Sequence, residues 1–346
     1  MDNAYETRKT LLLRAGEAGA VETAGRILRE GGLVAIPTET VYGLAADAFC
    51  TEAVETIFRA KGRPADNPLI VHIAEMETLA VLVTEIPPQA KRLAEAFWPG
   101  PLTMILPKAE RVPGIVSAGL PTVAVRFPSH PDARAVIRAA GTPLAAPSAN
   151  RSGSPSPTTA QHVIDDMNGR IDAVLDGGPC EVGLESTVIT LAGPTPRLLR
   201  PGGITLEMLQ AVLGQVEMDE AVLKPLKKGV AAASPGMKYK HYAPRARVII
   251  LDGPFEAYKN YVNSHNEEGT AALCFTGEET ALSVPALPLG AESDGAEQAH
   301  RLFDALRETD RMGASLVFAR CPSKTGVGLA VYNRLIRAAG FEVRKL

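Results

Sequence analysis

Several features that mark common protein classes are scarce in this sequence. Only four of its 346 residues are cysteine, no C-x-x-C motif occurs, and no cysteine and histidine residues have the spacing of a zinc site. Disulfide-rich scaffolds and structural zinc sites are therefore excluded. We expect reduced thiols packed in the core at Cys50, Cys180, Cys274 and Cys321.

Aromatic residues and excess charge are also scarce. Phe, Trp and Tyr together make up 5% of the chain, and the formal net charge is -3 at pH 7. Such a charge gives no global attraction to nucleic acid or to acidic membranes. RNA recognition calls for a basic face with stacking aromatic rings. The composition therefore speaks against an RNA-binding module, although one basic segment, described below, leaves it open.

Long apolar runs are missing as well. No stretch approaches the ~20 apolar residues of a membrane-spanning helix. Residues 1–14 are mixed and charged, and their only apolar run, at 11–13, is too short for the core of a signal peptide. Hydrophobic residues at 46% and charged residues at 22% are typical of a globular fold. We therefore expect a cytoplasmic protein without membrane contact.

Common nucleotide-binding and hydrolase motifs do not occur. Lys324-Thr325 lacks the glycine loop that precedes this pair in a phosphate-binding loop, and Gly326-x-Gly328 is only a fragment of a dinucleotide fingerprint, so we interpret it as a helix start. Neither G-x-S-x-G nor H-E-x-x-H is present. Any nucleotide must therefore bind outside the common phosphate loop.

Helical and strand patterns alternate along the first 213 residues. Apolar residues at Val54, Ile57 and Phe58 have the spacing of one helix face, and Thr158 and Thr205 are predicted helix caps. The alternation predicts an α/β (α+β-like) domain with a mixed, twisted sheet. The expected helices are 21–30, 53–60, 89–97, 132–140, 158–167 and 205–213. The expected strands are 33–37, 69–73, 102–106, 122–127, 173–175 and 187–191.

A basic segment interrupts this alternation. Between Lys224 and Arg247 there are seven Lys or Arg residues and no Asp or Glu, and prolines punctuate the run. Such a stretch is usually functional or a linker. We therefore predict a catalytic domain at 14–213, a basic linker at 214–246, and a smaller Rossmann-like α/β domain at 247–346. The elements expected in the smaller domain are strands 247–251, 271–275 and 315–318 and helices 255–264, 295–307 and 328–339.

Three polar segments lie next to predicted strands. Two of them follow a strand, and the third leads into one. Residues 61–73 read KGRPADNPLIVHI, with two cations on a proline-stiffened stretch that suits an anionic ligand such as a phosphate chain. Residues 37–48 and 146–158 each follow an apolar run and are rich in hydroxyl groups. Since ligands of open α/β sheets bind at the carboxyl ends of strands, we expect these segments to form one site.

These segments resemble the YrdC-like family. The matching runs are PTETVYGLAADA, KGRPADNPLIVHI, TVAVRF, SANRSGSPSPT, GLESTV and LRPG, in this order between residues 33 and 203. The run SPGMKYKHYAP at 234–244 resembles the linker of the longer, two-domain members. The resemblance implies an L-threonylcarbamoyladenylate synthase, a nucleotidyltransferase that uses L-threonine, bicarbonate and ATP. Its product serves the modification of tRNA adenosine 37.

The resemblance also implies site residues. Lys61 and Arg63 are expected to act electrostatically on the triphosphate. The implied ATP contacts are Lys61, Arg63, Asn67, Thr122, Ser148, Asn150, Ser156 and Arg200, with Tyr239 or Tyr242 from a linker that closes over the nucleotide. The implied threonine contacts are Thr40, His72, Arg126, Ala146 and Ser186.

The residues themselves leave some of these roles open. Arg126 lies on an apolar strand, where a cation is costly unless it is paired, so we favour a ligand carboxylate as its partner. His72 could equally be a hydrogen-bonded core histidine, and Asn150 a turn residue. Glu39 and Glu185 could be surface residues.

The implied reaction requires no protein nucleophile. Catalysis would rest on positioning and on neutralising phosphate charge. We expect Mg²⁺ bound through ATP phosphates, no protein metal ligands and no organic cofactor. A downstream threonylcarbamoyl transferase and tRNA would be indirect partners. The alternatives are a double-stranded RNA-binding module or another carbamoyl-adenylating enzyme, although the acylphosphatase and zinc-finger segments of hydrogenase maturation proteins are missing here.

Overall fold

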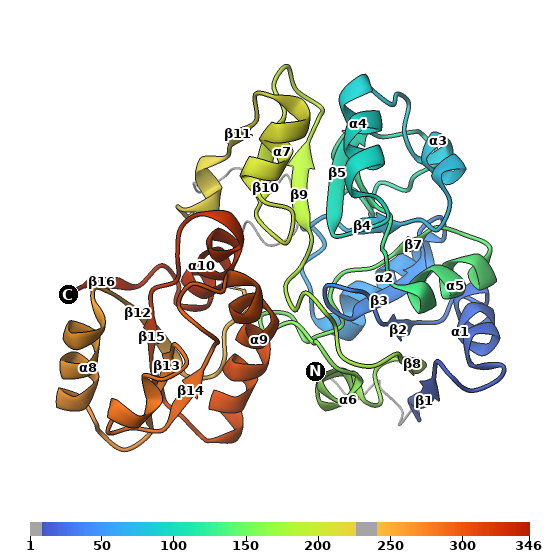
Figure 1. Ribbon diagram of the computed structural model, residues 1–346. Coiled ribbons are helices and arrows are strands. Elements are labelled where there is room, and N and C mark those ends of the chain that lie inside the picture. Colours follow the sequence, from blue (N-terminus) through green and yellow to red (C-terminus); the bar gives the residue numbers. More distant parts are fainter. Residues whose placement is uncertain (1–8, 226–240) are drawn as a thin grey trace.

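Two sheets organise the chain in a computed structural model that describes residues 9–225 and 241–346. The first has 11 strands in the order β1-β8-β2-β3-β7-β4-β6-β5-β9-β10-β11, and the second has five in the order β14-β13-β15-β12-β16 (Figure 1). Within these described ranges, we find no helix with the length and apolar character needed to cross a membrane.

The first sheet is mixed, as predicted. For example, β4 is parallel to β6 but antiparallel to β7, and β5 is antiparallel to β6 but parallel to β9. Its strands are β1 (Leu11–Arg14), β2 (Val34–Ile36), β3 (Gly43–Asp47), β4 (Ile70–His72), β5 (Leu102–Pro107), β6 (Thr122–Arg126), β7 (Leu144–Ala145), β8 (Ala173–Asp176), β9 (Thr187–Thr190), β10 (Arg197–Arg200) and β11 (Glu217–Met218). Its helices are α1 (Ala20–Arg29), α2 (Thr51–Lys61), α3 (Leu79–Leu82), α4 (Pro88–Phe97), α5 (Pro131–Ala140), α6 (Ala160–Met167) and α7 (Leu206–Leu213), with 3₁₀ turns η1 (Met76–Thr78) and η2 (Glu220–Val222).

Local signals account for most helix boundaries. The apolar face of α2 is buried, and α5 ends at Gly141, whose φ of 68° favours glycine. Thr205 caps α7 as predicted, because its side chain accepts a hydrogen bond from the Met208 amide. The predicted cap of α6 is one residue early: Thr159, not Thr158, accepts from the amide three residues on.

Several elements of this domain were not expected from the sequence, among them β3, β10, β11 and η2. β3 turns the segment after β2 into an antiparallel hairpin, because Gly43 to Asp47 pair back onto β2. β10 ends at Arg200 and pairs with β9. β11 and η2 extend the sheet into the predicted linker, and Ala221 packs with Ile70 and Ile105. The first folded unit therefore continues beyond residue 213.

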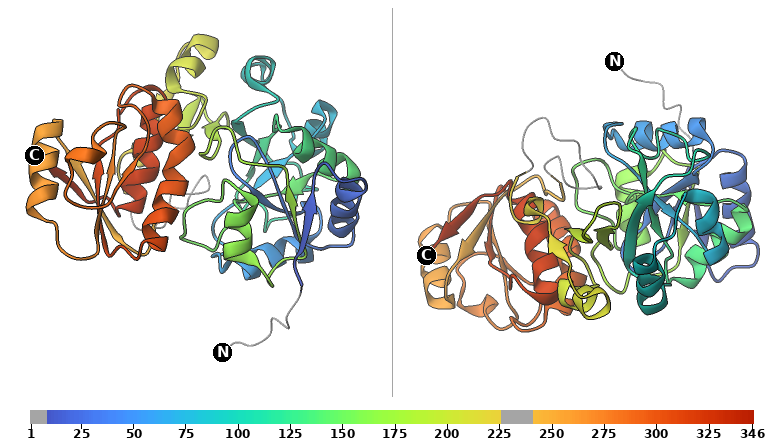
Figure 2. Two further views of the ribbon diagram at one scale, coloured as in Figure 1. Left: turned by 60° about the horizontal axis from the view of Figure 1, so that its bottom comes forward. Right: turned by 90° about the horizontal axis from the view of Figure 1, so that it is seen from above.

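The second sheet is parallel in all its strand pairs. Its helices α9 and α10 lie on the side that faces the first domain, whereas α8 covers the far side (Figures 1 and 2). Its strands are β12 (Arg247–Asp252), β13 (Thr270–Cys274), β14 (Ala286–Pro288), β15 (Leu316–Arg320) and β16 (Val343–Lys345). Its helices are α8 (Phe255–Ser264), α9 (Gly295–Arg311) and α10 (Gly326–Ala338), with the 3₁₀ turn η3 (Glu279–Ala281).

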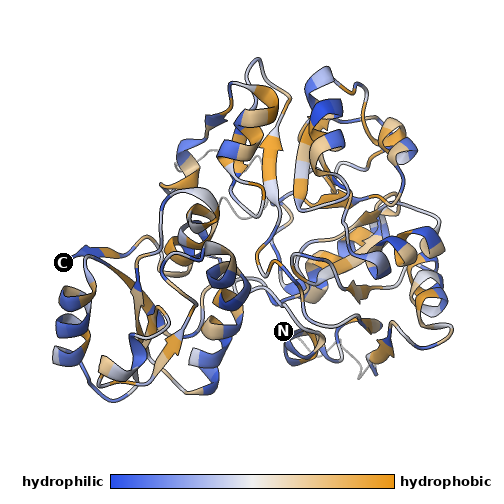
Figure 3. Ribbon diagram, in the orientation of Figure 1, coloured by the Kyte–Doolittle hydropathy of each residue, from blue (hydrophilic) through white to orange (hydrophobic). Residues whose placement is uncertain are grey.

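The hydrophobic cores of the two domains meet. Strands of both sheets are mostly hydrophobic, while α8 and α9 carry hydrophilic residues on their outer faces (Figure 3). Val41 and Leu184 of the first domain are buried in one cluster with Phe303 and Leu335 of the second. The four cysteines are free, but only Cys180 and Cys274 are fully buried.

Candidate active site

A cavity lies where the first domain meets the residues just before β12. It is lined by parts of seven separate chain segments, which the fold brings together. The lining residues are Thr38, Val41, Gly43, Arg63, Ile70, His72, Arg126, Ala146, Pro147, Ser148, Glu185, Ser186, Arg200, His241 and Tyr242. Eight of the predicted site residues are among them: Arg63, His72, Arg126, Ala146, Ser148, Ser186, Arg200 and Tyr242.

Three arginines give the cavity its positive charge. Arg126 and Arg200 are 3% and 6% exposed, and Arg63 is half-buried. Arg63 donates from Nη2 to the Pro68 carbonyl at 3.1 Å, while its buried Nε has no hydrogen-bond partner in the described part of the chain. Burial lowers the pKa of Arg63 to about 10, which still leaves it cationic at neutral pH. The three guanidinium groups suit a ligand with several negative charges.

Lys61, a predicted ATP contact, is buried next to the cavity lining and is not part of it. It is the last residue of α2, it is buried, and its Nζ donates to the carbonyls of Ser148 and Asn150. Burial and the neighbouring Arg63 lower the pKa of Lys61 well below its usual value. Lys61 therefore ties α2 to the loop after β7 and does not line the cavity.

Arg126 and His72 are neighbours across β6 and β4. The Arg126 Nη2 lies 2.8 Å from Oε1 of Glu39, although the two groups are not aligned for a hydrogen bond. Burial alone would raise the pKa of Glu39, but Arg126 brings it below the usual value. Burial and Arg126 lower the pKa of His72 to about 3, so its ring is neutral, and Nδ1 contacts the Ile70 carbonyl at 3.2 Å.

The remaining predicted residues lie beside the cavity or away from it. Both side-chain polar atoms of Asn67 are buried without hydrogen-bond partners among the described residues. Asn150 Nδ2 donates to the Arg151 and Ser154 carbonyls, which is the contact pattern of a turn residue. Thr40 Oγ1 lies 2.9 Å from Thr38 Oγ1.

The last predicted ATP contacts come from three parts of the chain. Ser156 Oγ donates to the Glu185 carboxylate. Thr122 begins β6 opposite Pro107 and does not line the cavity. Tyr239 lies outside the described residues. Tyr242, which does line the cavity, has a φ of 65° and a ring centroid 5.3 Å from that of Phe303.

Comparison with known proteins identifies the family. A family described as "Telomere recombination" matches residues 26–202, and one described as "Threonylcarbamoyl-AMP synthase, C-terminal domain" matches residues 204–340. The chain is 47% identical to threonylcarbamoyl-AMP synthase of Pyrococcus abyssi, over 95% of this chain and 97% of that protein. It is also 47% identical to the Bacillus subtilis enzyme of that name, over 93% and 94%. The chain belongs to the threonylcarbamoyl-AMP synthase family.

A solved structure of this family has the same fold. It is Sua5 of Pyrococcus abyssi complexed with L-threonine, which is 46% identical to this chain. The two superpose with a TM-score of 0.91, covering 97% of this chain and 99% of that one. The mixed sheet with a smaller α/β domain is therefore the architecture of a two-domain threonylcarbamoyl-AMP synthase.

Four polar residues of the cavity region were not among the predicted contacts. Thr38, Glu185 and His241 line the cavity, and Glu39 pairs with Arg126. All four lie inside the runs that carry the resemblance, so the signal was present. The sequence did not indicate that the carboxylates of Glu39 and Glu185 are both buried against arginines.

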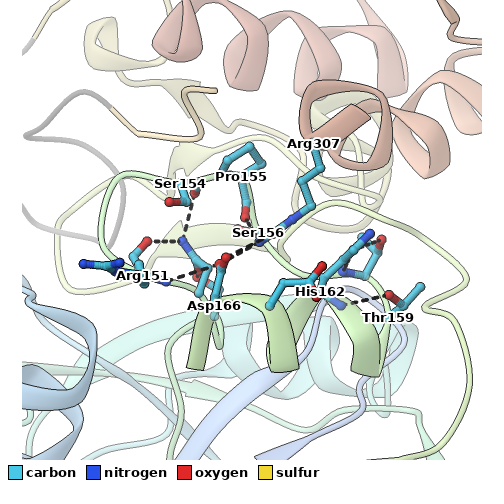
Figure 4. A network of polar contacts seen from close by, with 12 residues as sticks. Arg151, Ser154, Pro155, Ser156, Thr159, His162, Asp166 and Arg307 are labelled. Atoms are coloured by element: carbon cyan, nitrogen blue, oxygen red, sulfur yellow. Dashed lines mark hydrogen bonds and ion pairs between the residues drawn. The ribbon is translucent and has the colours of Figure 1, made fainter. Parts of the chain in front are cut away.

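Residues of α9 in the second domain contact the loop 151–158 and helix α6 of the first domain. Arg307 of α9 donates from Nη2 to the Pro155 carbonyl at 2.6 Å and to Asp166 of α6 at 2.8 Å (Figure 4). His162, whose amide is capped by Thr159, lies 3.2 Å from Asp304 of α9. The loop 151–158 is therefore anchored to both domains.

Proposed function

We propose that this chain catalyses the formation of threonylcarbamoyl-AMP and pyrophosphate from L-threonine, bicarbonate and ATP. The observation that carries the proposal is a cavity lined by Arg63, Arg126 and Arg200 in a chain that belongs to the threonylcarbamoyl-AMP synthase family over nearly its whole length. The enzyme is a nucleotidyltransferase. Its product would be passed in the cytoplasm to a transferase that acts on tRNA adenosine 37.

The chemistry needs alignment and charge rather than a nucleophilic side chain. The threonine amine attacks the carbon of bicarbonate and water leaves, which gives a carbamate. A carbamate oxygen then forms a bond to the α-phosphorus of ATP, the bond from that phosphorus to the bridging oxygen breaks, and pyrophosphate leaves with the electron pair. Two anions must meet in this step, so neutralising cations lower the barrier.

The ATP side of the cavity is proposed to be built around Arg63 and Arg200. Among the described residues, the Arg63 Nε–H and the side-chain amide of Asn67, four positions further along, have no hydrogen-bond partner. Ser148 lines the cavity from the loop that Lys61 anchors. The other proposed ATP contacts are Lys61, Thr122, Asn150, Ser156, Tyr239 and Tyr242.

Magnesium is best treated as part of the ATP substrate. No group of three or more His, Cys, Asp or Glu residues in the described ranges could hold a metal ion. Mg²⁺ commonly binds phosphate oxygens and water with few protein ligands. We therefore propose that Mg²⁺ enters with ATP and is held by its phosphates.

The threonine side is proposed to be built around Arg126. A bidentate pair with the amino-acid carboxylate would use guanidinium atoms that make no aligned hydrogen bond within the described chain. The neutral ring of His72 and the Oγ of Ser186 offer further polar contacts, and Ala146 contributes an apolar wall. Thr40 does not line the cavity, so its hydroxyl would act on the substrate indirectly, through its contact with the Thr38 hydroxyl.

A pyrophosphate-release assay tests the proposed function. We expect release that needs L-threonine and bicarbonate together, with threonylcarbamoyl-AMP detected by mass spectrometry. Serine should be a weaker substrate rather than an inert one, because one methyl group is worth ~1–3 kcal/mol. Equal release without an amino acid would contradict the assignment. Filter binding with double-stranded RNA and tRNA tests the RNA-binding alternative in parallel.

A further inference from the structure

Arg334 of α10 is the most deeply buried cation at the boundary of the two domains. Its relative exposure is 0%, and it donates both to its own neighbour, Asn333 Oδ1 at 2.8 Å, and to residues of the first domain. Its Nε donates to Glu185 Oε2 at 2.7 Å, and its Nη2 donates to the Glu185 carbonyl at 3.1 Å. Its Nη1 donates to the Pro201 carbonyl at 2.9 Å. One guanidinium group therefore joins two segments of the first domain.

Both of these segments carry residues that line the cavity. Ser186 follows Glu185, and Arg200 precedes Pro201. Arg200 in turn donates from Nε to the Ser186 carbonyl at 3.0 Å and from Nη2 to Ser186 Oγ at 3.2 Å. The guanidinium group of Arg334 thus fixes the spacing between the two chain segments that carry Arg200 and Ser186.

Arg334 also balances a charge that opposes ATP binding. Glu185 lines the cavity, and its carboxylate accepts hydrogen bonds from Ser156 and Arg334. Burial would raise the pKa of Glu185, but Arg334 and then Arg200 lower it, so the group is ionised. An ionised carboxylate beside a triphosphate repels it unless a cation compensates. Lys61, His241 and Tyr242 are the other titratable groups that interact with Glu185.

We propose that Arg334 is a positioning residue of the synthase reaction, supplied by the second domain. It holds Glu185 and the segments of Ser186 and Arg200 in the arrangement that accepts ATP, and it cancels the charge of Glu185. It does not line the cavity and so does not touch the substrates. The inference rests on the proposed function, and it gives the second domain a part in the chemistry.

The test compares Arg334→Met with a matched buried arginine of the second domain. Arg320→Met is the control, because Arg320 is 3% exposed and also binds a carboxylate, that of Glu278, and a carbonyl, that of Gly253. Both of these partners belong to the second domain, and neither lines the cavity. Misplacing groups that orient the substrates costs about 100-fold in rate. We expect a loss of about that size in kcat/KM for ATP with Arg334→Met and a change below about threefold with Arg320→Met.

A pH profile separates positioning from mere stability. In Arg334→Met the Glu185 carboxylate lacks its cation and should bind a proton at low pH. Between pH 5.5 and 8, kcat/KM for ATP should then fall as the pH rises, because the ionised carboxylate repels the phosphates. The Arg334→Met/Glu185→Gln double variant should lose this dependence and regain about tenfold in kcat/KM.

Three results would overturn the proposal: unchanged kcat/KM in Arg334→Met, an equal loss in Arg320→Met, or a double variant no better than the single one. Thermal unfolding of each variant checks that it is folded. Threonine- and bicarbonate-dependent activity of the unaltered chain tests the proposed function separately. Should that activity be missing, ATP dissociation constants from calorimetry replace kcat/KM in the same comparison.

Discussion

At the residue scale, the proposed function assigns individual arginines of the cavity to two different ligands. We expect Arg63→Ala to weaken ATP binding and Arg126→Ala to weaken L-threonine binding, each by about 1.5–3 kcal/mol, the value of a charged hydrogen bond. The reason is their separation: Arg63 follows α2, whereas Arg126 ends β6 beside His72. Calorimetric titration of each variant with each ligand measures the division.

The exposed Arg59, on the same helix that leads to Arg63, provides the control for this experiment. Arg59→Ala should leave both dissociation constants unchanged. If Arg63→Ala and Arg126→Ala lowered the affinity for both ligands equally, the division into two regions would be wrong.

The buried ring of His72, a second single residue, makes the free energy of unfolding depend on pH. Its pKa falls from 6.5 to about 3 on folding because of burial and Arg126. Between these values the unfolded chain binds the proton and the folded chain does not, so stability is full above pH 6.5 and falls as the pH drops. One such group contributes about 1.4 kcal/mol per pH unit.

Substitution of His72 should therefore flatten the curve of unfolding free energy against pH. We expect His72→Gln to remove about 1.4 kcal/mol per pH unit from the slope between pH 6 and 5, measured by urea denaturation. His241, with a pKa also lowered to about 3, should keep part of the slope. His265→Gln, at an exposed position of the second domain, is the control and should change nothing. An unaltered slope in His72→Gln would contradict the buried neutral state.

At the element scale, local caps fix where helices begin. Thr205 accepts from the Met208 amide at the start of α7, which packs beside α4. We expect Thr205→Ala to lower the free energy of unfolding by about 1 kcal/mol, because one amide loses its partner. Thr205→Ser keeps the hydroxyl and should retain most of the stability. Equal losses in both variants, measured by denaturant titration, would show that packing of the threonine methyl matters more than the cap.

At the scale of the whole molecule, the two domains should unfold together. Leu184 of the first domain is fully buried in the cluster of the second, and the pair of Arg334 and Glu185 joins the same surfaces. We expect a single transition in scanning calorimetry. Leu184→Ala should destabilise that whole transition by about 2–5 kcal/mol through the cavity it leaves.

Leu12 provides the matched control for this prediction. It lies on β1 at 52% exposure, so Leu12→Ala should change the free energy of unfolding by less than about 0.5 kcal/mol. Two resolved transitions, only one of them shifted by Leu184→Ala, would show instead that the domains unfold independently.

The sequence by itself determined the elements and the segments that meet at the site. Helix faces such as that of α2, and the Thr205 cap, depend on residues three or four apart, so they are visible in any window of the chain. The runs around Arg63, Arg126 and Arg200 indicated the family for the same reason. The one-residue error at Thr158 reflects two adjacent threonines that are equally good caps by composition.

Only the tertiary structure decided which charged side chains of those segments are buried and which groups they contact. The sequence predicts that Lys61 acts on the triphosphate, but only the fold shows that its ammonium group is buried against the carbonyls of Ser148 and Asn150. Arg334 reaches Glu185 across 149 positions of sequence, and no local pattern encodes a partner at that distance. Burial removes solvent screening and leaves each charge to its nearest partners, so the pairing of charges depends on the packing of the domains.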